Sequence, residues 1–189
     1  MDDSTEGMTG VWLVGQELLR AARALARAGV EAAQVDAELL MAHVLAARRV
    51  HVISHPDRRL QDEEVYKFRE LAGRRERREP LAYIIGAKEF WGLGFEVGPG
   101  VMVPRPETEI LVEVTLAELR GRGALVVEVG TGCGCVAVAL AVELPDARIY
   151  ATEFSPDAVE VARRNAAKHQ VEARVAVLEG DLLGPLPNE

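Results

Sequence analysis

Residues 126–134 read VVEVGTGCG, a glycine-rich loop that directly follows an almost continuous apolar stretch. A stretch of this kind is typical of a parallel strand that is covered on both faces. Strand-like and helix-like segments alternate after it, and Ser155-Pro156-Asp157 has the composition of a helix start. The alternation predicts half of a doubly wound α/β sheet. The expected strands are 124–129, 148–152 and 174–178, and the expected helices are 135–143 and the segment that begins at Ser155.

The loop has the spacing G-x-G-x-G, with glycines at 130, 132 and 134. Glycine permits a tight turn with positive φ, and it lets a ligand approach the N–H groups at the start of the next helix. A dinucleotide site would place its third glycine one position later, where this sequence has Cys135. Glu153 ends the second strand, where a carboxylate can accept hydrogen bonds from both ribose hydroxyls. Loop and acid predict a nucleoside ligand without a diphosphate; the alternative is an ordinary turn with a surface glutamate.

The first 80 residues have the pattern of a small helical bundle. Apolar residues at helical spacing predict helices over 11–28, over 33–47 and from Asp62, which is the expected N-cap of the third. Gly29 stands where a C′ glycine would end the first helix. The Arg-rich segment 69–79 is expected to end the bundle and form a linker. The residues expected to face inward are Val14, Leu18, Ala22, Leu25 and Ala26 in the first helix, and Val35, Leu39, Leu40 and Val44 in the second.

A hairpin is expected between the bundle and the sheet. Two short β-type runs, 90–91 and 95–97, flank a glycine-containing link, and a Pro-Gly turn and a strand over 101–103 follow. Pro106 fits the first turn of a helix, which is expected to stop at Gly121. The residues expected to face inward on this helix are Leu111, Val114 and Ala117.

Composition narrows the class of protein. The chain is 49% apolar but has no apolar run long enough to span a membrane. Its polar start, residues 1–10, is expected to be a flexible leader and lacks the pattern of a signal peptide. The absence of a disulfide framework fits a reducing, cytoplasmic location. The net charge is −1 over residues 1–80 and −7 over residues 81–189, which argues against nucleic acid as a partner.

Two clusters of side chains admit more than one interpretation. Cys133 and Cys135 could form a metal or redox pair, but two ligands do not complete a tetrahedral site, so buried packing is favoured and no metal is expected. The arginines within 74–78 could bind RNA or an acidic partner, or they could form a solvated face with neighbouring glutamates.

The motifs resemble those of a known family. The pair EVGTGCG (128–134) and TEFSPDAVEVARRNA (152–166) is similar to motifs of class I methyltransferases. Upstream, EPLAYIIG (79–86), EFWGLGF (89–95) and VPRPETEILVE (103–113) resemble the HemK/PrmC family of glutamine N5-methyltransferases, which modify the GGQ motif of peptide-chain release factors. The likeness covers roughly residues 11–189, and PRPETE is its most specific stretch.

The resemblance implies a Rossmann-like class I methyltransferase sheet, of which residues 104–189 form the N-terminal part and bind S-adenosylmethionine. A helical domain, residues 11–79, would dock the release factor, and residues 80–103 would be a linker with the hairpin. Arg105, Pro106 and Glu107 would form part of the wall over the site. The implied cofactor-binding residues are Gly130, Thr131, Gly132, Cys133 and Gly134 at the methionine end, Glu153 at the ribose, and Asp181 and Leu182 at the adenine.

One family motif has no counterpart. Methyl transfer is an in-line displacement, so most of the catalysis is positioning. The family orients the acceptor amide with an Asn-Pro-Pro-Tyr motif after a fourth strand, and no such motif occurs up to Glu189. Asn188 is rejected because no strand separates it from the Asp181 loop, so no catalytic residue is assigned. Without a fourth strand, 124–129 would expose an apolar edge, and we expect a C-terminally truncated chain that is inactive alone and marginally stable or self-associating.

Other functions stay open at this stage. An adenine-N6 nucleic-acid methyltransferase shares the Asn-Pro-Pro-aromatic chemistry. A nucleotide-dependent oxidoreductase would need a glycine where the sequence has Cys135. A non-catalytic module that binds S-adenosylmethionine or a nucleotide is the third alternative.

Overall fold

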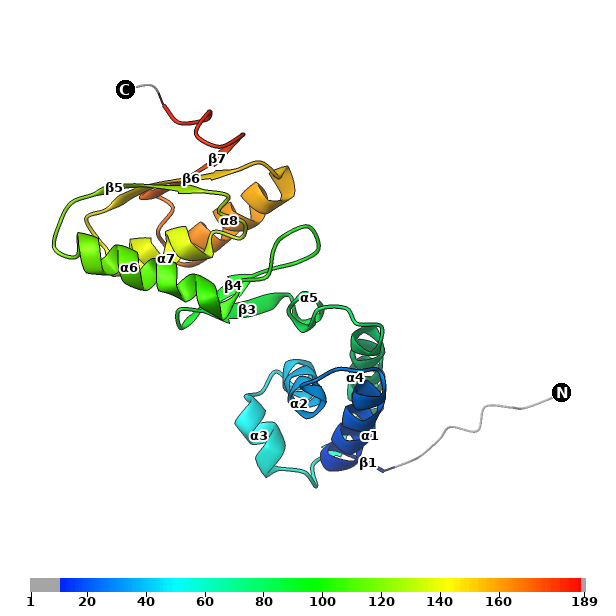
Figure 1. The fold of residues 1–189 in the computed structure, drawn as a ribbon. Helices are drawn as coiled ribbons and strands as arrows, with labels where there is room; N and C mark the ends of the chain where they lie inside the picture. Colours follow the sequence, from blue (N-terminus) through cyan, green and yellow to red (C-terminus); the bar gives the residue numbers. More distant parts are fainter. Residues whose placement is uncertain (1–10, 188–189) are drawn as a thin grey trace. The chain divides into compact units, whose positions relative to one another are not determined.

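The structure, a computed structural model, describes residues 11–187. The chain divides into two compact units, with the boundary between Ile85 and Gly86 (Figure 1). None of the described helices is both long and apolar enough to cross a lipid bilayer.

The first unit is a helical bundle, as expected. Its largest fully buried side chains include Phe68, Leu25 and Met41, which belong to three different helices. A two-stranded antiparallel ribbon joins β1 to β2. The elements are β1 (Trp12–Leu13), α1 (Val14–Arg27), α2 (Ala33–Val44), α3 (Arg49–Ser54), β2 (Arg59–Leu60), α4 (Asp62–Glu76) and α5 (Leu81–Ile85).

The helix ends partly match the prediction. Gly29 ends α1 with a φ of +77°, and the N–H of Val30 donates to the carbonyl of Leu25 at 3.0 Å, as in a Schellman motif. The first helix begins only at Val14, because the two residues before it pair with β2. The N-cap of α4 is Gln61 rather than Asp62, since the Gln61 N–H donates to the side chain of Glu64 at 2.9 Å.

The inward faces of α1 and α2 were predicted only in part. Ala21 is buried in place of Ala26 on α1, and α2 ends three residues earlier than expected. Val35 is 37% exposed, whereas the neighbouring Asp36 is only 6% exposed. Asp36 lies on the inward face because it has a partner there: Arg75 Nε of α4 donates to Asp36 Oδ2 at 2.8 Å.

The Arg-rich segment is not a linker for most of its length, because α4 continues through Glu76. Its arginines make contacts inside the unit. Arg69 donates to both oxygens of the buried Glu17 at 2.8 and 2.7 Å, which holds the pKa of that carboxyl below its usual range. Within the cluster at 74–78, Arg74 pairs with Glu79, Arg75 with Asp36, and Arg78 donates to the Gly29 carbonyl. Most of the cluster is therefore used to hold the bundle together.

The second unit contains a hairpin and a three-stranded parallel sheet in the order β5-β6-β7. Helices α6, α7 and α8 lie on one side of this sheet (Figure 1). The elements are β3 (Ala87–Phe90), β4 (Leu93–Glu96), the 3₁₀ turn η1 (Pro106–Thr108), α6 (Glu109–Leu119), β5 (Leu125–Val129), α7 (Cys135–Glu143), β6 (Arg148–Glu153), α8 (Pro156–Lys168) and β7 (Val175–Glu179).

The hairpin is confirmed, but its turn is at residues 91–92 and not between residues 91 and 95. Trp91 and Gly92 form a two-residue turn with φ of +53° and +69°, as in a type I′ hairpin. Residues 101–103 were predicted to be a strand, and this was wrong: residues 97–105 form neither helix nor strand. The segment instead runs toward the glycine loop, where it contributes to a pocket.

The inward face of α6 was also predicted wrongly. Val112 and Leu116 are buried, whereas Leu111 and Val114 are each 59% exposed. The 3₁₀ turn at Pro106–Thr108 precedes the α-helix, and its tighter winding shifts the face that later residues present.

The strand β5 is covered on one face only, contrary to its prediction as a doubly covered strand. Leu125, Val127 and Val129 are 54%, 41% and 46% exposed. Within residues 11–187, β5 pairs with β6 alone, so its other edge is free there, as the sequence predicted.

Candidate cofactor pocket

The site lies at the carboxyl ends of β5 and β6. In the parallel register Val129 is opposite Thr152, so the glycine loop and the end of β6 start side by side. The N–H groups of Gly130 and Thr131 both donate to the Thr152 carbonyl, at 2.8 and 3.1 Å. Ligands of open parallel sheets bind outside these ends.

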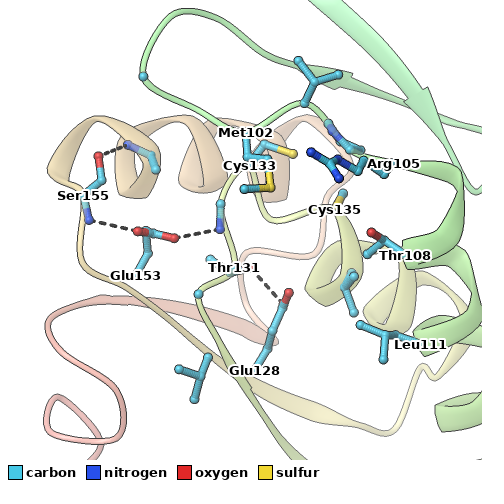
Figure 2. A pocket seen from close by; sticks show the side chains of 18 residues that line it. Met102, Arg105, Thr108, Leu111, Glu128, Thr131, Cys133, Cys135, Glu153 and Ser155 are labelled. Carbon is cyan, nitrogen blue, oxygen red and sulfur yellow. Dashed lines mark hydrogen bonds between the residues drawn. The ribbon is translucent and has the colours of Figure 1, made fainter.

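A pocket of about 570 Å³ opens at this point (Figure 2). Its walls come from the glycine loop, the end of β6, the start of α8 and the segment that precedes α6. The lining residues are Gly100, Met102, Val103, Pro104, Arg105, Thr108, Leu111, Glu128, Val129, Gly130, Thr131, Gly132, Cys133, Cys135, Val136, Glu153, Ser155 and Ala158.

The three loop glycines have different roles. All have positive φ, +73° at Gly130, +58° at Gly132 and +81° at Gly134. A Cβ at either of the first two would meet no heavy atom within 4 Å, which leaves open space over the loop backbone. A Cβ at Gly134 would lie 3.2 Å from the Ala162 Cβ, so this glycine permits close packing on α8 and does not line the pocket.

Glu153 is fixed by backbone donors on both sides (Figure 2). The Gly132 N–H donates to its Oε2 and the Ser155 N–H donates to its Oε1, each at 2.9 Å. Each carboxylate oxygen can accept more than one hydrogen bond, so the group can still receive two hydroxyls of a ligand. Ser155 also caps α8: its hydroxyl accepts from the Ala158 N–H at 3.4 Å, and Pro156 follows at the first helical position, as predicted.

Glu128 lines the same pocket, and the sequence analysis did not identify it. Burial raises its pKa to about 7, and the nearby charge of Glu153 acts in the same direction. The Thr131 hydroxyl donates to Glu128 Oε2 at 2.8 Å, which opposes the rise. The signal was present in the sequence: a single acid interrupts an otherwise apolar strand just before the glycines.

Cys133 and Cys135 are both buried and both line the pocket. The two thiols share a hydrogen bond, which lowers the pKa of Cys133 and, together with burial, raises that of Cys135. Among residues 11–187, no group of three or more His, Cys, Asp and Glu side chains has a geometry that could hold a metal ion.

The expected wall is only partly assembled. Arg105 lines the pocket, whereas Pro106 and Glu107 are exposed and lie outside its lining. The glutamate of PRPETE that makes a visible contact is Glu109, which accepts from the Trp91 N–H at 2.8 Å and so ties the hairpin turn to α6. Wall residues that the sequence analysis missed include Met102, Thr108 and Leu111.

The expected adenine residues lie apart from this lining. Asp181 and Leu182 follow β7 in a short irregular segment, and Leu182 is 64% exposed. Their contact with adenine stays a prediction. Phe154, between the lining residues Glu153 and Ser155, is 76% exposed just after β6 and is outside the pocket lining.

Comparison with known proteins bears on this geometry. Residues 16–86 match the PrmC N-terminal domain, and residues 106–189 match the methyltransferase small domain. The release factor glutamine methyltransferase of Nitratidesulfovibrio vulgaris is 44% identical over 167 residues, covering 88% of this chain and 57% of the relative. That of Geobacter sulfurreducens is 41% identical over 179 residues, covering 95% and 62%. Over both of its units the chain is similar to the HemK/PrmC family.

The chain thus spans about three fifths of the length of these PrmC relatives. Among solved structures, the ribosomal protein L11 methylase of Lactobacillus delbrueckii subsp. bulgaricus is similar, with 25% identity, a TM-score of 0.41 and coverage of 48% of this chain and 46% of that one. The predicted fold is confirmed: a parallel α/β sheet of the class I methyltransferase type follows a helical unit.

Neither of the two domain matches includes residues 87–105. This stretch nevertheless supplies the hairpin and five lining residues of the pocket, from Gly100 to Arg105. The link between the two matched domains is therefore part of the site.

Proposed function

We propose that this chain belongs to an S-adenosylmethionine-dependent enzyme that methylates the side-chain amide nitrogen of the GGQ glutamine in peptide-chain release factors. The observation that carries the proposal is the pocket itself, in which a glycine loop, Glu128 and Glu153 surround one space of about 570 Å³. The names of the PrmC relatives support the substrate, because both are release factor glutamine methyltransferases.

The residues present fit S-adenosylmethionine. Open space over Gly130 and Gly132 admits the methionine portion against the loop backbone. Glu128 is placed to accept hydrogen bonds from an ammonium group, and Glu153 from the ribose hydroxyls. Asp181 and Leu182 are proposed for the adenine side. Bound S-adenosylmethionine would supply a sulfonium methyl group to the acceptor.

The chain's own contribution to the reaction is positioning. Loop, carboxylates and wall hold the cofactor in one orientation and exclude water from one side of it. The apolar lining at Met102, Leu111 and Val136 favours such exclusion. The 189 residues contain no Asn-Pro-Pro-Tyr sequence to orient the acceptor amide, so we propose that this polypeptide alone binds the cofactor without transferring its methyl group.

The remaining assignments complete the proposal. The helical unit docks the release factor, the protein acts in the cytoplasm, and the free β5 edge and its exposed apolar residues allow the isolated polypeptide to self-associate. The net charge of −7 over residues 81–189 disfavours a phosphate backbone near the pocket. A glutamine on a protein is therefore preferred to adenine in nucleic acid as the acceptor.

Two measurements test this function. Calorimetry with S-adenosylhomocysteine and with NAD should show binding of the first only, and Glu153→Ala should weaken it while the exposed Glu107→Gln leaves it unchanged. The protein that contains the family's acceptor motif should then transfer labelled methyl groups to a release factor but not to one whose GGQ glutamine is replaced by alanine. Transfer to DNA instead would support the adenine-N6 alternative, and binding of NAD would support the oxidoreductase.

A further inference from the structure

Asn165 lies in α8 and is completely buried, with 0% of its surface exposed. It is not among the residues that line the pocket. Burial of a side-chain amide costs free energy unless its N–H groups and its oxygen are hydrogen-bonded. The hydrogen-bond partners of Asn165 therefore show what stabilises it in this buried position.

All of its partners are backbone groups from two separate segments. Its Oδ1 accepts from the Glu96 N–H at 2.8 Å, and its Nδ2 donates to the Glu96 carbonyl at 3.0 Å. The same Nδ2 donates to the Cys133 carbonyl at 2.9 Å. One side chain thus joins residues that are 32 and 69 positions away in the sequence.

These two segments form different sides of the pocket. Cys133 belongs to the glycine loop and lines the pocket. Glu96 is the last residue of β4, after which residues 97–105 run to the wall and provide Met102 and Arg105. The amide therefore links the start of the wall segment to the loop.

Three neighbouring contacts, from α8 and from its C-cap residue His169, each reach one of the two segments. Arg164 Nε donates to Glu96 Oε2 at 3.0 Å, and the His169 ring lies 3.0 Å from the Gly94 carbonyl, so both hold the hairpin alone. Ala162 packs against Gly134 of the loop. Among the hydrogen bonds of the described residues, those of Asn165 are the ones that connect α8 to the loop and the hairpin together.

We propose that Asn165 is a positioning residue that sets the spacing between the glycine loop and the wall of the pocket. The proposal rests on the proposed function only for the choice of ligand in its second test. A ligand that touches both sides binds only those molecules in which the two sides are correctly spaced. Loss of the amide lowers the fraction of such molecules, and the apparent affinity of the ligand falls in proportion.

The first test needs no ligand. Hydrogen exchange is followed in peptides from 97–105 and 130–134, and in the hairpin over 87–96, for wild type, Asn165→Asp, Asn165→Ala and the control Arg164→Gln. The first two peptides should exchange at least about tenfold faster in the alanine variant, as expected when a buried hydrogen bond is lost. The control should loosen the hairpin alone. Unchanged exchange in both Asn165 variants, or the same double effect in the control, would overturn the proposal.

The second test separates hydrogen bonding from packing. A buried aspartic acid has a raised pKa, and its neutral form can still donate one hydrogen bond to a carbonyl. Each affinity for S-adenosylhomocysteine is compared with that of wild type at the same pH. The affinity of Asn165→Asp should therefore be near that of wild type at pH 5 and about tenfold or more weaker by pH 8. The affinity of Asn165→Ala should be weaker than that of wild type at both pH values. A pH-independent defect in the aspartate variant would contradict the positioning role. If wild type itself fails to bind, the proposed function fails and the exchange comparison still decides on Asn165.

Discussion

Replacement of Glu128 by glutamine should stabilise the ligand-free protein above neutral pH. The pKa of Glu128 rises from 4.5 to about 7 on folding, chiefly because burial disfavours its charge. One pKa unit corresponds to about 1.4 kcal/mol, so forcing the buried carboxyl to ionise costs about 3 kcal/mol. Glutamine retains an oxygen that can accept from the Thr131 hydroxyl, which donates to Glu128 at 2.8 Å. The variant removes the charge and keeps the contact.

The sign of the effect follows from linkage. A folded pKa above the unfolded value means that the stability contributed by neutral Glu128 is fully present below pH 4.5 and is lost as the pH rises through about 7. The difference in the free energy of unfolding between Glu128→Gln and wild type should therefore grow over this range. It should level off at about 3 kcal/mol above pH 8.

Urea unfolding, followed by Trp91 fluorescence in a Trp12→Phe background, measures this difference from pH 5 to pH 8.5. Glu107→Gln, which removes an exposed carboxylate outside the pocket lining, should follow wild type throughout. The ammonium group of a bound ligand should instead favour the charged carboxylate, so binding of S-adenosylhomocysteine at pH 6 should release protons from wild type but not from Glu128→Gln. A stability difference that does not change between pH 5 and pH 8.5 would refute the burial argument.

Three further outcomes are expected. Gly134→Ala should lower the free energy of unfolding by about 2 kcal/mol, because positive φ strains alanine and its Cβ would lie 3.2 Å from that of Ala162; urea unfolding measures this. Iodoacetamide should alkylate Cys133 or Cys135 slowly through the pocket and more slowly with S-adenosylhomocysteine bound, as read by intact mass; labelling that ignores the ligand would place the thiols outside the site. Phe154→Ala should weaken S-adenosylhomocysteine binding by about 1 kcal/mol or more, as expected for lost base stacking, without changing stability; unaltered affinity in calorimetry would exclude stacking.

Local signals in the sequence were enough to predict most elements of the second unit. The strand–loop–helix order and the cap at Ser155-Pro156 depend on residues that are close in sequence, and both are present. Gly29 ends α1 for the same reason, because a single residue with positive φ suffices to stop a helix. The position of Glu153 beside the glycine loop was predictable because it is the last residue of a strand that pairs with the strand before the loop.

Features that depend on distant partners were not predictable in this way. The face of α2 is set by Asp36 and its bond to Arg75, 39 residues away, and apolar periodicity contains no information about that pair. The shifted face of α6 follows from a 3₁₀ turn whose length proline alone does not specify. Asn165 lies within a family motif, but the sequence gives no indication of its partners. Glu96 and Cys133 are distant in sequence, and only the fold brings them next to it.

Hydrogen bonds within the protein hold several parts of the pocket in place, and this has consequences for affinity. Glu153 is held by two N–H donors, and Asn165 joins the glycine loop to the start of the wall segment. A ligand that meets such a site loses less of its binding energy to ordering side chains and loops. Cofactor binding should therefore depend mainly on residues 86–187 and hardly on the helical unit. The ion pairs of the bundle, such as Arg69 with Glu17, can consequently be broken at a cost in stability with little change in cofactor affinity.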